Sequence, residues 1–241
     1  MSDLSVKKAN GKIKFLCFIA AAFFVFSCAC HKLFNQAGRA FKHTETPFVI
    51  VIDAGHGGID GGVTGKISNV CESEINLEIS KKLEKLFADA GFSVVMTRTS
   101  SGGLYGIVSA GYKKRDMQKR AEIIKNANAD LFISVHQNFF ADKNRRGAQV
   151  FYYGDKDKEF AACMQNKLNG MTTASRKYQT LFGDYFVLKQ ADCPSCLVEC
   201  GFLSNEADEK LLISESHQAY VAKTVFLGAL DYLAGVGGDN A

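Results

Sequence analysis

The chain lacks several features that would point to a specialised class of protein. Its 241 residues include no tryptophan and only 2 prolines, which excludes a proline-rich linker protein. Hydrophobic residues make up 47% and charged residues 22%, close to globular averages, which excludes a wholly disordered or collagen-like chain. The sequence also contains no internal repeat and no low-complexity tract. The length therefore predicts one domain of ordinary size, alone or with an appendage.

Outside its first 46 residues the chain also lacks an excess of one charge. Lys and Arg total 29 and Asp and Glu total 25, but residues 1–46 contain seven of the basic residues and only two of the acidic ones. The remaining 22 basic and 23 acidic residues almost cancel and create no field suited to a polyanion. Nucleic acid is therefore not expected as a partner.

Residues 1–46 have the pattern of an export segment. Four lysines precede Phe15–Cys30, a run of sixteen residues without a charge. As a helix this run would be about 24 Å long, short of the roughly 30 Å hydrocarbon core. We interpret residues 1–46 as a signal peptide or signal anchor with a polar tether, which predicts a membrane-anchored or secreted, extracytoplasmic protein. Two alternatives fit less well: a buried core helix, and lipidation at Val25–Cys28, where Phe26 is unfavourable.

Cysteine is too scarce in the domain to form a disulfide scaffold. Three of the eight cysteines lie in the export segment, which leaves Cys71, Cys163, Cys193, Cys196 and Cys200. An odd number cannot all pair, and a single Cys-x-x-Cys without a second pair is a weak zinc signal. Cys193 and Cys196 could form a redox pair, half of a zinc site or a strained disulfide. For most of these cysteines we expect small buried side chains.

From Pro47 onward, apolar runs alternate with helical periodicity. Strands are predicted at residues 48–53, 92–97, 131–135, 148–153, 185–188 and 196–199. Helices are predicted at residues 75–91, 116–127, 158–168 and, as one or two segments, 211–233. Residues 100–114 form the one long loop. This alternation predicts a single α/β layered domain over residues 47–235, with a mostly parallel central sheet flanked by helices and a disordered tail at 236–241.

Two histidines and a carboxylate lie at the ends of predicted strands. His56 follows the strand at 48–53, His136 follows the strand at 131–135, and Glu199 ends the strand at 196–199. In open α/β sheets functional residues gather beyond the carboxyl ends of the strands, so we expect these side chains to share one cleft. Each histidine alone is more typical of a hydrogen-bonded structural residue. Together they favour a shared metal site.

A catalytic zinc ion usually takes three protein ligands, so a carboxylate is needed beside the two histidines. The candidates are Asp53, Asp60, Glu72, Glu74 and Glu199. Glu72 lies just before a predicted helix, where a carboxylate also interacts favourably with the helix dipole without binding any metal. Periodicity does not choose between Glu72 and Glu74.

Five sequence blocks carry a family resemblance. They are VIDAGHGG at 51–58, ESEINL at 72–77, TRT at 97–99, SVHQN at 134–138 and VECGFLSN at 198–205. In this order they resemble the zinc-dependent N-acetylmuramoyl-L-alanine amidases of the amidase type 3 family, bacterial cell-wall hydrolases, over about residues 48–233. The resemblance implies that Zn²⁺ is bound by His56, Glu72 and His136. The family's ligand is the glutamate four residues before Asn76, and its catalytic glutamate corresponds to Glu199.

The resemblance also implies a reaction and a setting. The substrate would be peptidoglycan glycan strands with stem peptides, cleaved between N-acetylmuramic acid and L-alanine. Three features resemble the spore-cortex, germination-specific branch of the family. They are the short anchor, the lack of a wall-binding repeat, and the residues at 103–105 and 113–117. Members of that branch allow muramic-δ-lactam to form together with a partner deacetylase. Gln137 replaces an alanine common in relatives, and Ser100 and Ser101 stand where many relatives are acidic. The need for an accessory protein stays open.

The resemblance further implies roles for individual side chains. Glu199 would take a proton from the attacking water and later deliver it to the leaving alanine nitrogen. Asn138, just past the third ligand, is expected to hydrogen-bond to substrate or to a ligand. For Arg98 and Arg120 we expect structural contacts with carboxylates or the backbone rather than with substrate.

Three other functions compete with the amidase. The same ligands would serve a zinc peptidase or a deacetylase of the cell wall. A cysteine hydrolase would use Cys200 and His136, although a cysteine next to Glu199 on an apolar strand is expected to face away and be inert. A non-catalytic wall-binding module is disfavoured, because binding alone needs no open metal site.

Overall fold

The structure, a computed structural model, describes residues 47–171 and 176–238. The description below concerns the unit Phe48–Ala241, the second of the two into which the chain divides. The predicted export segment at 1–46 lies outside the described residues. No helix among the residues described combines the length and the apolar character needed to cross a membrane.

Six strands form one sheet in the order β2-β1-β3-β6-β4-β5. Their bounds are β1 Val49–Ala54, β2 Ser93–Met96, β3 Leu131–Asn138, β4 Gln149–Tyr152, β5 Leu181–Phe182 and β6 Ser195–Phe202. Strands β2, β1, β3 and β6 are parallel to one another, whereas β4 runs antiparallel to β6 and β5 is parallel to β4. The prediction of a mostly parallel sheet is confirmed.

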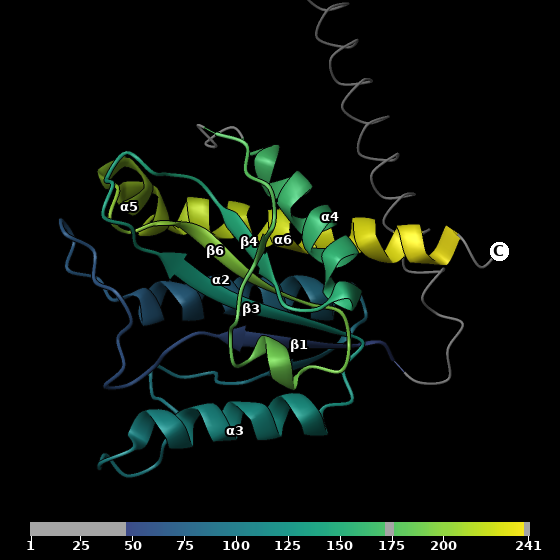
Figure 1. The fold of residues 1–241 in the computed structure, drawn as a ribbon, viewed down its shortest axis with the longest axis horizontal. Helices are drawn as coiled ribbons and strands as arrows, with labels where there is room; N and C mark the ends of the chain where they lie inside the picture. The colour runs from purple at the N-terminus through teal and green to yellow at the C-terminus, as the bar shows by residue number, and fades with distance from the viewer. Residues whose placement is uncertain (1–46, 172–175, 239–241) are drawn as a thin grey trace, which may run out of the picture. The chain divides into compact units, whose positions relative to one another are not determined.

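Helices cover both faces of this sheet (Figure 1). Their bounds are α2 Glu72–Asp89, α3 Tyr112–Asn126, α4 Lys158–Asn169, α5 Glu206–Leu212 and α6 Glu215–Gly238. Helix α6 packs against both α2 and α4, and these three helices lie on one side of the sheet. Helix α3 lies on the other side, beside the short 3₁₀ helix η3 at Leu188–Gln190. The predicted single α/β domain with flanking helices is therefore confirmed.

Side-chain alternation along the strands decides which helical layer each residue faces. Val51 of β1, Phe132 of β3 and Leu197 of β6 lie on the face covered by α3, where they form a buried cluster with Ile124 and Leu188. Towards the carboxyl end of β3 and β6, the same face carries His136 and Glu199, which are paired in register. The apolar cluster and these polar residues of the site thus lie on the same face of the sheet, with the polar residues nearer the carboxyl ends of the strands.

Several predicted boundaries are wrong. Residues 185–188 are not a strand: Val187 and Leu188 are apolar because they pack beneath α3, and the strand in this part of the chain is β5 at Leu181–Phe182. Strand β3 reaches Asn138 and β6 reaches Phe202, so His136 and Glu199 lie within strands rather than just beyond or at their ends.

The helical boundaries also differ. Helix α3 begins at Tyr112, so the long predicted loop ends at Gly111, whose φ of 76° is in the left-handed region that favours glycine. The predicted helical region 211–233 contains the end of α5 and most of α6, and α6 continues to Gly238, into the predicted tail. Residues 239–241 lie outside the described residues.

Candidate metal centre

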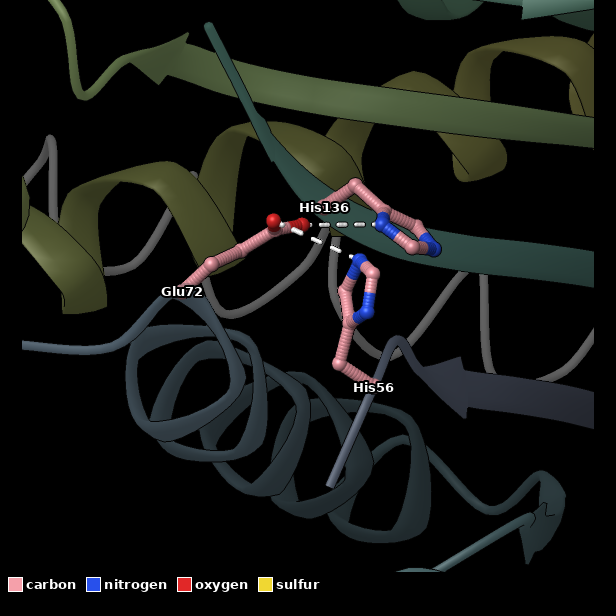
Figure 2. A group of neighbouring side chains, drawn as sticks. All are labelled: His56, Glu72 and His136. Carbon is pink, nitrogen blue, oxygen red and sulfur yellow. Dashed lines mark hydrogen bonds and ion pairs between the residues drawn. The ribbon is translucent and has the colours of Figure 1, made fainter. Parts of the chain in front are cut away.

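Three metal-ligand side chains converge at the carboxyl edge of the sheet. A ring nitrogen of His56, a ring nitrogen of His136 and a carboxylate oxygen of Glu72 all lie within 4.8 Å of one another. Figure 2 shows Glu72 projecting from the start of α2 between His136 of β3 and His56 of the loop after β1. Glu72 Oε2 is 3.3 Å from His56 Nε2, and Glu72 Oε1 is 2.9 Å from His136 Nδ1. Glu74, the alternative carboxylate, is exposed to solvent.

Backbone geometry brings His56 into the group. Its φ of 61° is unusual for a residue other than glycine and turns the chain sharply after β1. The following turn returns Asp60 to the ring, with Asp60 Oδ2 3.1 Å from His56 Nδ1. Burial lowers the pKa of His56, but the carboxylates of Glu72 and Asp60 outweigh it and raise the pKa. Asp60 therefore occupies one ring nitrogen and leaves Nε2 to face Glu72.

Gly55 makes room for the second histidine. A Cβ atom at Gly55 would lie 2.2 Å from Cε1 and 2.3 Å from Nε2 of His136. The imidazole of His136 therefore lies directly over the Gly55 backbone, and any larger residue would displace the ring. This is a steric requirement, since the φ of Gly55 is not in the left-handed region.

Glu72 is held as an anion. Burial alone would raise the pKa of Glu72, but hydrogen bonds and charges from His136 and His56 hold the pKa far below its usual range. The N–H groups of Val63 and Gln137 also donate to its carboxylate, at 3.0 and 3.1 Å. Two imidazoles and one fixed carboxylate are a donor set that fits a catalytic zinc ion, with a fourth position open.

Glu199 has a different electrostatic character. Burial raises the pKa of Glu199 to about 7, with a further rise from the charge of Glu72. Its Oε2 atom is buried and has no hydrogen-bond partner among the described residues. An unpaired buried oxygen calls for a functional explanation, and a carboxyl group that titrates near neutrality is suited to proton transfer.

Two buried arginines shape the surroundings of the site. Arg98 donates to the backbone carbonyls of Ala54, Gly55, Ser73 and Ser100. Arg120 donates to the carboxylates of Asp53 and Asp116 and to the carbonyls of Ala54 and His56. These are the structural contacts that the sequence predicts for both arginines.

Asn138 has only backbone contacts among its described hydrogen bonds. Its side-chain oxygen accepts from the N–H of Phe139, and its carbonyl oxygen accepts from the N–H of Leu203. These contacts do not involve the metal-ligand group. A substrate contact for Asn138 stays a prediction.

The thiol of Cys200 is not placed to act as a nucleophile in the site. All five cysteines of the described region are free. Cys200 is buried on the opposite face of β6 from Glu199, and burial holds its pKa far above the usual range. A thiolate at this position is therefore disfavoured, which argues against a cysteine hydrolase. Burial also raises the pKa of Cys193, to about 11.

Comparisons with known proteins agree on one family. A family model described as N-acetylmuramoyl-L-alanine amidase (Amidase_3) matches residues 50–231. The chain is 31% identical over 204 residues to a germination-specific N-acetylmuramoyl-L-alanine amidase of Bacillus subtilis (strain 168). This alignment covers 82% of this chain and 85% of that protein.

Two solved structures extend this agreement to the fold. The CwlD amidase of Clostridioides difficile, solved in complex with the GerS lipoprotein, superposes with a TM-score of 0.74 at 36% identity and covers 78% of this chain and 98% of its own. An N-acetylmuramoyl-L-alanine amidase from Clostridium difficile 630 gives a TM-score of 0.69 at 30% identity, with 78% and 97% covered.

Proposed function

The chain belongs to the N-acetylmuramoyl-L-alanine amidase family, and from this premise we propose how its own residues carry out the reaction. The enzyme hydrolyses peptidoglycan at the amide bond between N-acetylmuramic acid and L-alanine. We propose that His56, Glu72 and His136 hold one Zn²⁺ ion. The observation that carries this proposal is the convergence of their three ligand atoms within 4.8 Å.

The donor set matches the chemistry that the reaction needs. An unactivated amide resists attack by neutral water, and a zinc ion held here would polarise the scissile carbonyl and lower the pKa of water. Glu72 supports this because it is an anion and its carboxylate is fixed from both sides by the histidines.

Glu199 is the group that we propose moves the proton. Its carboxylate takes a proton from the water that attacks the lactyl carbonyl carbon, and it then delivers this proton to the alanine nitrogen as the C–N bond breaks. The products are a free carboxyl group on muramic acid and a peptide with a free amino terminus. The raised pKa of Glu199, about 7, suits both directions of transfer near neutral pH.

Mass spectrometry of digested peptidoglycan tests this proposal. Purified sacculi are incubated with the enzyme, with a chelator, and with a chelator followed by excess Zn²⁺. Intact stem peptides released from intact glycan, only when Zn²⁺ is available, are the expected result. New amino-sugar amines would indicate a deacetylase, cleavage within the peptides would indicate a peptidase, and undiminished activity in chelator would contradict the metal site.

For the biological setting we propose the spore cortex. The similarity to a germination-specific amidase supports this, and the relative solved with a lipoprotein supports a requirement for an accessory protein. We also propose that residues 1–46 export the enzyme and tether it to the membrane, and that a partner deacetylase acts on its product. Spores of a deletion strain should then lack muramic-δ-lactam in their cortex, and a normal lactam content would contradict this assignment.

A further inference from the structure

Asn76 contacts all three segments that carry the proposed metal ligands. It is fully buried on α2, one helical turn after Glu72. Its Nδ2 donates to Glu72 Oε1 at 3.2 Å and to the carbonyl oxygen of Gly55 at 3.1 Å. Its Oδ1 accepts from Gln137 Nε2 at 3.0 Å. Gly55 immediately precedes His56, and Gln137 immediately follows His136.

We propose that Asn76 is a positioning residue that fixes the spacing of His56, Glu72 and His136 before the metal binds. This inference rests on the proposed metal site and goes beyond it. An amide side chain has two N–H donors and one acceptor oxygen suited to this task, and Asn76 commits all of them to these three segments. Groups that orient metal ligands in this way typically change metal affinity by about 10–100-fold when they are removed.

Other contacts hold the same segments individually, so the loss of Asn76 need not unfold the site. Arg98 Nη2 also donates to the Gly55 carbonyl, at 2.9 Å. The N–H of Gln137 also donates to Glu72 Oε1. Apart from the proposed ligands themselves, Asn76 is the one side chain among the described contacts that bonds to all three segments, and the expected defect is therefore in their relative placement.

The side chain of Gln137 is the second member of this arrangement. Successive strand residues face opposite sides of the sheet, so Gln137 reaches towards α2 while His136 lies on the other face. Gln137 is buried, and its Nε2 donates to Asn76 Oδ1. Gln137→Ala removes this donor and keeps the backbone N–H that binds Glu72.

The test measures zinc affinity of the metal-free full chain by competition with a chelator, and the absorption spectrum after Co²⁺ replaces Zn²⁺. The variants are Asn76→Leu, which keeps the size and removes the hydrogen bonds, and Asn76→Asp, which points oxygen atoms at Glu72 and Gly55. The matched control is Ser80→Ala, at a buried residue of the same helix whose Oγ has no hydrogen-bond partner among the described residues.

The zinc dissociation constant should rise about 10–100-fold in Asn76→Leu, and at least as far in Asn76→Asp. Gln137→Ala should give a smaller rise, and Ser80→Ala none. The cobalt spectrum should change in both Asn76 variants, because the geometry of the ligands changes. Asn76→Leu with the wild-type constant and spectrum would overturn the inference.

Two further outcomes separate this inference from the proposed function. Cooperative unfolding in urea shows whether the Asn76 variants are folded. If neither variant is folded, the test rests on Gln137→Ala, and an unchanged zinc dissociation constant in that variant overturns the inference. A wild-type chain that binds no zinc overturns the metal site and this inference together. A wild-type chain that binds zinc and releases no stem peptides contradicts only the proposed reaction, and the zinc constants of the variants still decide the role of Asn76.

Discussion

At the scale of single residues, the site separates two carboxyl groups by their surroundings. Glu72 lies between two imidazoles and stays ionised, whereas Glu199 is buried without a hydrogen-bond partner for its Oε2 among the described residues and titrates at about 7. Pairs of acids whose pKa values are pushed apart in this way commonly divide the work of a site. Here one would hold the metal and the other would move the proton.

Glu199→Gln should keep zinc and lose turnover. Glutamine cannot accept the proton of the attacking water, so kcat should fall about 10²–10⁴-fold, while zinc content should stay at the wild-type level. In the wild type the ionised form of Glu199 is the active base, so activity should fall as the pH decreases through the pKa of Glu199. This pKa is about 7 in the metal-free chain, and a Zn²⁺ ion bound nearby would lower it. The zinc content of Glu199→Gln should decline with falling pH as in the wild type, because that decline comes from protonation of His56 and His136. Wild-type turnover in this variant would exclude the proton-transfer role.

Gly55→Ala should weaken zinc binding by moving a ligand. The added methyl group would overlap the His136 ring, and overpacking of this kind typically costs about 1–3 kcal/mol. The measurement is the zinc dissociation constant together with the urea midpoint. Gly102→Ala is the control, since a Cβ there meets only Ser100 Oγ at 3.6 Å, an ordinary contact. Equal zinc affinity in both variants would show that the His136 ring can move without consequence.

The sequence predicts the metal ligands better than it predicts the residues that hold these ligands in place. His56 and His136 are the only histidines of the domain that follow predicted strands, and the carboxyl ends of parallel strands lie along one edge of the sheet. The sequence therefore predicts that the two histidines converge with a carboxylate. Family resemblance was needed to prefer Glu72 over Glu74, since both precede the predicted helix at 75–91 and periodicity does not distinguish them. The sequence does not predict the role of Asn76, because this role depends on the direction of one amide group, and residue spacing carries no information about that direction.

At the scale of elements, the short helix α5 anchors a loop beside the site. Buried Glu209 accepts hydrogen bonds from the backbone N–H groups of Lys66, Ile67 and Ser68 and from Ser68 Oγ. This loop connects the two segments that carry His56 and Glu72. The placement of the ligands therefore depends on an element more than a hundred residues away in the chain.

Glu209→Ala should destabilise the fold by about 1–3 kcal/mol in urea unfolding, because several N–H groups lose their acceptor. Burial raises the pKa of Glu209, but the hydrogen bonds from Ser68 and its neighbours outweigh burial and lower it. The contribution of Glu209 should therefore be complete above its ordinary pKa and disappear as pH falls through the lowered value. Glu206→Ala is the control, since Glu206 is exposed on the same helix and pairs with Lys210. Equal unfolding free energies in the two variants would contradict an anchoring role.

The sequence also predicted the elements unevenly, for physical reasons. Buried parallel strands are continuous apolar runs and are predicted, β1 to within one residue at each end, whereas β3 and β6 each extend three residues beyond the predicted end, where polar residues interrupt the apolar run. Strand β5 was missed because it has only two residues, both exposed at the sheet edge. Val187 and Leu188 are apolar for a different reason, since they fill the layer between the sheet and α3, and hydrophobicity alone does not distinguish the two environments.

At the scale of the whole molecule, the metal ligands come from segments that only the folded chain brings together. His56 follows β1, Glu72 begins α2 and His136 lies within β3, so the fold is what brings these three side chains together. An ion that binds the native state alone stabilises it by mass action. Binding also requires neutral imidazoles, so it weakens as the pH falls and the histidines become protonated.

Zinc should therefore raise the thermal stability of the chain. At a free Zn²⁺ concentration one hundred times its dissociation constant, the gain should be about 2.7 kcal/mol, seen as a higher Tm in calorimetry. The gain should vanish with a chelator, decline below neutral pH, and be absent in His136→Ala. Mg²⁺, which prefers oxygen ligands, should give little shift and serves as the control. A zinc-dependent Tm that survives in His136→Ala would place the ion elsewhere, and a wild-type Tm insensitive to zinc would contradict the site itself.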